Sequence, residues 1–315
     1  MAQLIKLSDY ISRYEQGLSH YTTQFLRLKK YQWDRLRIQW ENNSFDPIEE
    51  VEQAIEKKPT FLQSITKKFQ KQEEEEAEQI DEEIAQQFQP VLNYRPTTVQ
   101  QLKKVYEEQL YQFQMKWASS TLLASSTIGQ HYKRDVFLKD IVQQLPDHYL
   151  ILYEPILQIK KAPLDVNILI LTPLACYSIT VLNQEDAAVY VGSGDRFWTK
   201  KYKTYEYRML SPMIELNRTA KILQQLFLEQ DIHLPIKKVV LTKNGYIDFP
   251  SASYDVEVVD RKNYEEYMQE LIANSSPMKS AQFRAANYLL SIAQTTVRSE
   301  LFAQPESEEQ DEIKK

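Results

Sequence analysis

The chain has 315 residues and a mass of 37.2 kDa, and 43% of its residues are hydrophobic, which suffices for one large or two ordinary globular domains. Its formal net charge of −6 argues against a protein that coats nucleic acid through bulk charge, so any nucleic-acid surface must be a local basic patch. The one cysteine, Cys176, excludes an internal disulfide scaffold and a thiolate zinc site. With no signal sequence and no apolar stretch approaching 18 residues, we expect a cytoplasmic protein that does not span a membrane.

The chain is predicted to begin with helix. Ser8 or Asp9 can cap a segment in which aromatic residues and leucines recur at steps of three and four. Basic residues alternate with aromatic residues over 27–40, a pattern that suits a nucleic-acid backbone and its bases. A core-facing helix with a solvated basic face is the commoner explanation of such a pattern. A short helix is then predicted from Asp46-Pro47.

Residues 60–118 are predicted to form an arm that consists of a long antiparallel helical hairpin. The first helix runs from Phe61 to about Phe88, and its middle carries the acidic run Glu73–Glu76, which we expect to be solvated. The second helix has apolar residues at steps of three and four: Val99, Leu102, Tyr106, Leu110, Phe113 and Trp117. The arm could bind a protein partner or a second copy of the chain, and residues 1–118 are expected to form a helical region.

Residues 119–303 predict a mixed α/β domain with C-terminal helices, and residues 304–315 an acidic, disordered tail. Thr127 is expected to cap a helix whose apolar stripe ends at Leu145. Strands are expected at 149–153, 156–159, 166–171, 175–182, 188–191, 238–242 and 255–259. Later helices are expected to start at Ser211-Pro212, Asn263 and Ser276-Pro277.

Two adjacent strands within 164–182 carry polar residues at unusual positions. The period of two places Asp165, Asn167 and Leu169 on one face of the first strand, and Ser178 and Thr180 on one face of the second. Thr172-Pro173-Leu174 is the predicted tight connection between them. A carboxylate at the mouth of one strand therefore accompanies two short hydroxyl side chains on its neighbour.

Further motifs occur in a fixed order around these strands. They are Gly129-Gln130, Asp165 with Thr172-Pro173, Ser178-Ile179-Thr180, Gly194-Asp195-Arg196-Phe197-Trp198 and Ser211-Pro212-Met213-Ile214-Glu215. Ser178 lies 13 residues after Asp165, and Thr180 lies 15 residues after it. In order and spacing, residues 120–250 resemble the nuclease-related domain (NERD) family of the PD-(D/E)XK restriction-endonuclease-like superfamily. The resemblance implies a mixed sheet flanked by helices.

Most of the residues that the family uses for catalysis are replaced. The resemblance aligns a family Glu with Gln130, the Glu and Lys of the Glu-x-Lys motif with Ser178 and Thr180, and a family Gln with Glu215; Asp165 alone is kept. Hydrolysis by this superfamily needs two or more carboxylates for Mg²⁺ and a lysine that activates water. The resemblance therefore implies a catalytically degenerate binding or scaffolding module, which holds these five residues as a vestigial pocket and needs no cofactor.

Two alternatives remain open. A divergent nuclease could bind Mg²⁺ or Mn²⁺ through Asp165 and Glu215, with a nearby lysine in place of the missing one; alternatively, the helical arm could be the functional part. The candidate contacts for DNA or RNA are a basic cluster interleaved with tyrosines: Lys200, Lys201, Lys203 and Arg208. The four histidines show no metal-ligand spacing, and no nucleophile elbow or phosphate-binding loop is present.

Overall fold

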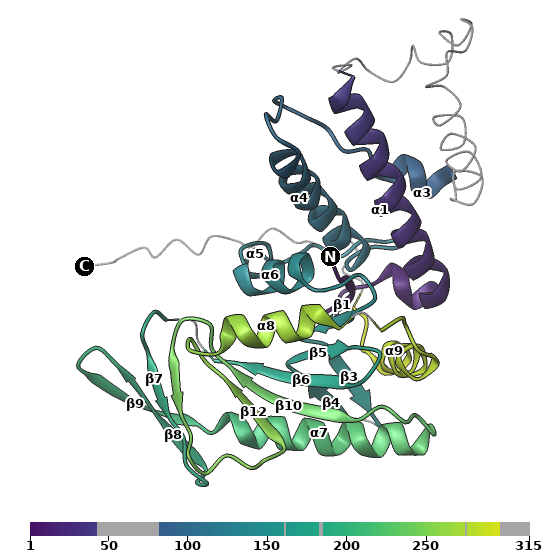
Figure 1. The fold of residues 1–315 in the computed structure, drawn as a ribbon. Coiled ribbons are helices and arrows are strands. Elements are labelled where there is room, and N and C mark those ends of the chain that lie inside the picture. The colour runs from purple at the N-terminus through teal and green to yellow at the C-terminus, as the bar shows by residue number, and fades with distance from the viewer. Residues whose placement is uncertain (43–81, 161, 183–184, 275, 297–315) are drawn as a thin grey trace, which may run out of the picture.

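The computed structural model describes residues 1–42, 82–160, 162–182, 185–274 and 276–296 (Figure 1). The predicted helix at Asp46-Pro47, most of the helix Phe61–Phe88 and the acidic tail lie outside the described residues. A mixed sheet forms the centre and has helices on both faces, with a pair of long helices at one end and a smaller sheet at the other (Figure 1). The predicted α/β architecture, with a helical N-terminal region, is confirmed.

The central sheet has six strands in the order β1-β2-β5-β6-β10-β12. They are β1 (Gln3–Leu7), β2 (Leu150–Tyr153), β5 (Ile168–Leu171), β6 (Cys176–Val181), β10 (Ile236–Leu241) and β12 (Val256–Val259). β2, β5 and β6 pair antiparallel, whereas β10 runs parallel to β6 and β12 runs parallel to β10. The predicted hairpin of β5 and β6 is confirmed, and the Thr172 hydroxyl fixes its turn by donating to the Ala175 carbonyl at 2.9 Å.

Helices cover the two faces of this sheet as the period-two pattern of the strands requires. Residues on one face, such as Ile170 and Val239, share a core with α6 (Val136–Gln144) and α8 (Tyr264–Ala273). Residues on the other face, such as Leu169, share a core with α7 (Pro212–Glu229) and α9 (Ser280–Ile292). The predicted start of α7 at Ser211-Pro212 is confirmed, because Ser211 is the N-cap and Pro212 the first helical residue. The last helix begins at Ser280, later than predicted.

The N-terminus differs from the predicted helical start. Residues Gln3–Leu7 form β1, which pairs with β2 and is fully buried. The 3₁₀ helix η1 (Arg13–Gln16) and helix α1 (Leu18–Glu41) follow it. A five-residue strand with a lysine, Lys6, as its fourth residue gives no local signal of burial; its stability comes from pairing with a strand more than 140 residues away. Residues 1–118 are therefore not purely helical.

The second predicted arm helix is confirmed as α4 (Val99–Trp117), with Thr98 as its N-cap. Its apolar seam packs against α1, which lies beside it and runs in the opposite direction (Figure 1). The short helix α3 (Glu82–Gln87) also contacts α1. One hydrophobic cluster joins Phe25 of α1, Trp117 of α4 and Leu150 of the sheet. The predicted boundary at residue 119 thus does not separate two cores.

Residues 127–145 form two helices instead of the predicted single helix. α5 (Gln130–Lys133) is followed by α6, and Asp135 caps α6 by accepting a hydrogen bond from the Leu138 amide at 3.0 Å. Because Asp135 provides its own cap in mid-segment, the helix restarts there and Thr127 does not act as the cap. Tyr132, Phe137, Ile141 and Leu145 are buried, as the predicted stripe requires.

The remaining strands form two smaller sheets. One has the order β11-β7-β8-β9 and consists of β7 (Val189–Val191), β8 (Phe197–Tyr202), β9 (Tyr205–Leu210) and β11 (Tyr246–Asp248). The other pairs β3 (Ile156–Ile159) with β4 (Ala162–Asp165). None of the described helices is both long and apolar enough to cross a lipid bilayer.

Candidate functional site

The pocket implied by the resemblance is filled by the protein's own side chains. Ser178 and Thr180, both on β6, keep only 2% and 7% of their surface exposed. The Asn167 amide nitrogen donates to the Thr180 hydroxyl oxygen at 3.1 Å, so the side chain of Asn167, which directly precedes β5, faces Thr180 of β6. Two buried hydroxyls therefore occupy the positions that the resemblance aligns with a Glu and a Lys.

The other residues of the predicted pocket lie on different elements. Asp165 is exposed and ends β4, where it pairs with Ile156 in the two-stranded sheet; it thus lies outside the central-sheet strand on which we expected it to sit. Gln130 is exposed on the first turn of α5, and Glu215 is half-buried in the first turn of α7. No group of three or more His, Cys, Asp or Glu side chains among the described residues is arranged to hold a metal ion. A hydroxyl is a poor sole ligand for Mg²⁺, and the two carboxylates lie on separate elements, so these residues do not form the metal site that the resemblance implies.

A lysine that the sequence did not single out lies beside the filled pocket. Lys238 of β10 is the register partner of Ser178, and its ammonium binds the Asp255 carboxylate at 2.7 Å and donates to the Asn217 side chain at 2.8 Å. Hydrogen bonds from Lys238 and Ser253 hold the pKa of Asp255 below its ordinary value. This cation is neutralised within the protein. Its proximity to Ser178 depends on the parallel pairing of β6 with β10, which a single strand pattern does not reveal.

The predicted basic cluster lies on the β8–β9 hairpin, which projects from the end of the molecule (Figure 1). Adjacent strand residues point to opposite faces, so Lys200 points away from the face that Lys201 and Arg208 share. Lys200 is mostly buried, with 12% of its side chain exposed, and binds the Glu185 carboxylate at 2.5 Å. Lys201 is exposed and binds Glu206 of the paired strand at 3.0 Å. Lys203 is exposed at the turn, 5.1 Å from the centre of the Tyr202 ring.

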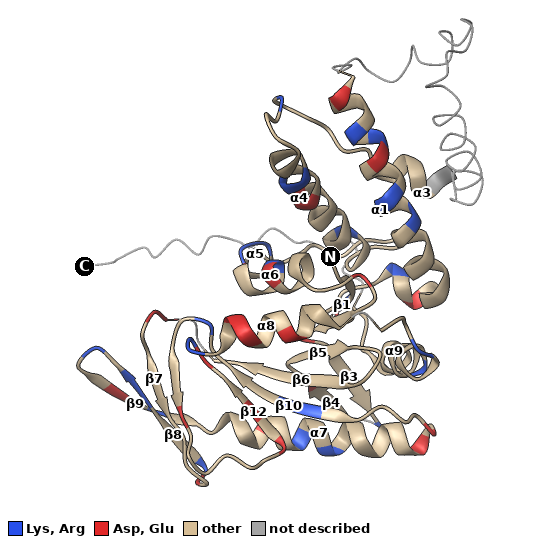
Figure 2. Ribbon diagram, viewed as in Figure 1, with Lys and Arg blue, Asp and Glu red and all other residues tan. Residues whose placement is uncertain are grey.

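One face of the hairpin combines arginines with an aromatic ring. The Arg208 guanidinium lies 4.0 Å from the centre of the Phe197 ring, and that of Arg196 lies 5.8 Å from it. We call these three residues the arginine face. They border a hollow of about 620 Å³. The rings of Tyr205 and Tyr207 are exposed nearby on the other side of β9, and acidic residues accompany the basic ones along the hairpin (Figure 2).

Comparisons with known proteins provide little further constraint. No protein-family model matches the chain, and no solved structure matches it. A curated RNA 2′,3′-cyclic phosphodiesterase from Geobacillus stearothermophilus is 54% identical over 41 residues, which are 13% of this chain and 13% of that protein. The match therefore spans only a small part of this relative's length, and so short a match does not assign the relative's activity to this chain.

Proposed function

We propose that the chain is a catalytically degenerate, nuclease-related binding module. The observation that carries the proposal is the filled pocket. The Thr180 hydroxyl accepts a hydrogen bond from Asn167 there, at the position that the resemblance aligns with a lysine that activates water. A carboxylate at the position of Ser178 would be buried, and a buried charge is costly without a metal or a partner. The loss of these charges is therefore compatible with a stable fold but not with Mg²⁺-dependent hydrolysis.

Single-stranded nucleic acid is the binding partner that best suits the exposed surface. The arginine face combines two guanidinium groups with a ring, and unpaired bases stack on such surfaces while cations contact the phosphates. The overall charge of −6 limits this interaction to a local patch. Among the predicted contacts, Arg208 and Lys203 suit this role better than Lys200 and Lys201, because carboxylates already bind the latter two.

The catalytic part of the proposal is tested by the nicking of supercoiled plasmid with Mg²⁺ or Mn²⁺. We expect no cleavage by the wild type, with an established nuclease as the positive control for plasmid and buffer. Asp165→Ala and Glu215→Ala are purified and assayed in the same way. Cleavage by the wild type that both substitutions abolish would instead support the divergent nuclease.

The binding part is tested by the fluorescence anisotropy of a labelled oligothymidylate. We expect Phe197→Ala to weaken binding by about 5- to 150-fold, because stacking contributes about 1–3 kcal/mol per base. Arg208→Ala should lower the salt dependence of the binding constant by about one unit of slope. Arg218→Ala, on the exposed surface of α7, is the matched control. No binding at low salt, or an equal loss with Arg218→Ala, would refute the nucleic-acid role.

The helical arm is a weaker candidate for the functional part. In the described residues the apolar seam of α4 packs against α1 and is buried from Leu102 to Trp117, so this part offers no free surface to a partner. The stretch with Glu73–Glu76 lies outside the described residues, and its role as a dimerising or partner-binding arm stays a prediction.

A further inference from the structure

The outer strand of the smaller sheet has an open edge. β9 ends the order β11-β7-β8-β9 and pairs with β8 without a bulge. Five of its six residues are exposed and the sixth, Met209, is half-buried. Of the described strands that end a sheet, β9 is the longest. Such an edge presents unpaired backbone N–H and C=O groups, which another strand can use.

The hairpin geometry determines which backbone groups face outward. The ladder pairs Tyr202 with Tyr205 across the two-residue turn Lys203-Thr204. The residues that flank a two-residue turn point their backbone groups at each other, and the direction alternates along the strand. Glu206, Arg208 and Leu210 therefore present their backbone N–H and C=O groups to the open edge. A second strand must place its own outward-facing residues opposite these three.

We propose that the partner of this edge is a second copy of the chain, with β9 paired antiparallel to β9 about a two-fold axis. Two such registers, centred on Tyr207 and on Arg208, pair five of the six strand residues of each copy. Centring the axis on Arg208 sets two like charges opposite each other, which is unfavourable. Centring it on Tyr207 sets Glu206 opposite the partner's Arg208 and repeats the pair by symmetry. The strand thus carries the complement of its own charge pattern.

The same register also arranges the rings on the other face. Tyr207 lies opposite the partner's Tyr207, and Tyr205 lies opposite the partner's Met209. Tyr205 and Tyr207 are 63% and 50% exposed in the single chain, and cross-strand aromatic pairs stabilise antiparallel sheets. The two four-stranded sheets become one continuous sheet, with both arginine faces on the same side. This dimer does not rest on the proposed nucleic-acid binding and would form without it.

Sedimentation velocity of the purified full chain, without nucleic acid, tests the dimer at several micromolar concentrations. We expect the wild type to sediment as a concentration-dependent dimer. Glu206→Arg and Arg208→Glu should each weaken association by at least about tenfold, because each gives the edge two like charges. An equimolar mixture of these two variants should associate again, since each then supplies the charges that oppose the other's, and the double variant should also dimerise.

Glu266→Arg, on the exposed surface of α8, controls for a general effect of charge reversal and should leave the dimer intact. Circular dichroism and urea unfolding verify that each variant is folded. A wild type that stays monomeric at all concentrations would overturn the proposal. A dimer that survives both single substitutions, or variants whose mixture remains monomeric, would also overturn it.

Discussion

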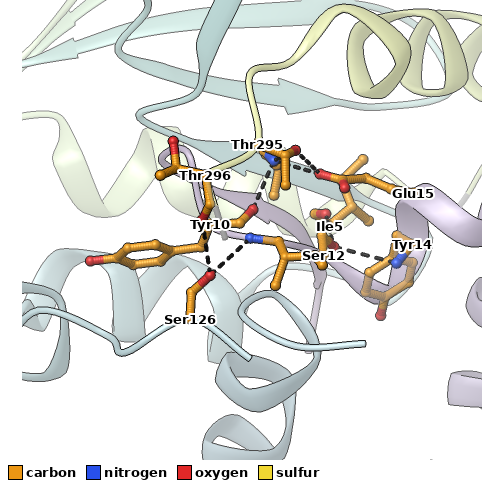
Figure 3. A network of polar contacts seen from close by, with 10 residues as sticks. Ile5, Tyr10, Ser12, Tyr14, Glu15, Ser126, Thr295 and Thr296 are labelled. Atoms are coloured by element: carbon orange, nitrogen blue, oxygen red, sulfur yellow. Dashed lines mark hydrogen bonds and ion pairs between the residues drawn. The ribbon is translucent and has the colours of Figure 1, made fainter. Parts of the chain in front are cut away.

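Two parts of the molecule carry similar ion pairs in opposite settings. One is the β8–β9 hairpin. The other is a buried polar cluster, called the seam below, which consists of Lys6, Tyr10, Glu15 and Thr295. The Lys6 side chain is 0% exposed, and its ammonium donates to Glu15 at 2.5 Å, to the Thr295 hydroxyl at 2.9 Å and to the Tyr10 carbonyl at 2.7 Å (Figure 3). Lys201 also binds a glutamate, but both side chains of that pair are at least half exposed. The seam cation has protein partners for all three of its donors, whereas the hairpin cation remains accessible to water.

This difference indicates which polar cluster serves the fold and which is available for binding. The seam joins β1, η1 and the chain after α9, and Thr296 extends it by donating its backbone N–H to the Asp9 carbonyl at 2.7 Å. Burial lowers the pKa of Lys6, and the ion pair with Glu15 opposes that shift. The hairpin packs only its inner side into the core, through residues such as Trp198, so its outer side is exposed, and our binding proposals rest on that surface.

The comparison predicts its largest effect at Glu15. Glu15→Leu leaves the buried Lys6 cation without its carboxylate, and we expect a loss of about 3–5 kcal/mol in the free energy of unfolding. The double variant Lys6→Met with Glu15→Leu removes both charges and should recover most of that loss. Urea unfolding monitored by circular dichroism measures both variants. Similar stabilities for Glu15→Leu and the wild type would show that the seam does not depend on this pair.

A smaller effect is expected in the filled pocket, which is buried like the seam but uncharged. Thr180→Val keeps the shape of the side chain and leaves the Asn167 amide without its acceptor, which should cost about 1–2 kcal/mol. Asn167→Leu in the same chain should reduce that cost, because no donor is then left unpaired. The same unfolding measurement checks both. If Thr180→Val were as stable as the wild type, the hydroxyl would have no structural role and its hydrogen bond with Asn167 would not stabilise the fold.

The hairpin should tolerate the loss of an ion pair best. Lys201→Gln removes the cation that binds Glu206, and we expect a change of about 1 kcal/mol or less, since water reaches both side chains of this exposed pair. Unfolding midpoints in low and high salt should converge for the wild type and this variant. A loss as large as that for Glu15→Leu would mean that the hairpin is part of the stabilising core.

Local patterns predicted the regular elements well. The steps of three and four gave α4, the Ser211-Pro212 cap gave α7, and the alternation around the Thr172 turn gave β5 and β6. Contacts between distant segments could not be predicted in this way. β1 is a strand because it pairs with β2, and Lys238 lies next to Ser178 because β10 returns parallel to β6 after the helix α7.

The basic cluster shows a different limit. Lys200 and Lys201 are neighbours in sequence, and the sequence therefore predicts that they belong to one basic patch. In β8 they point to opposite faces, so Lys200 binds Glu185 and Lys201 binds Glu206. The period of two would have separated them once the strand was recognised. Which of the two faces is buried depends on the packing of the hairpin against the core, and the segment alone does not carry that information.

His148 offers the smallest test, because it is a titrating group with an environment between these two settings. Its side chain is 18% exposed, and burial lowers its pKa, an effect that the nearby Asp147 carboxylate partly opposes. The folded state therefore binds fewer protons than the unfolded state below about pH 6.5, the ordinary pKa of histidine, and stability must fall as the pH falls through that range.

His148→Gln cannot titrate and should lose less stability than the wild type between about pH 7 and about pH 5. His233→Gln, at an exposed histidine, controls for the loss of an imidazole, and urea midpoints at the two pH values give the comparison. Equal losses in wild type and His148→Gln would show that burial of this imidazole does not contribute to the pH dependence of folding.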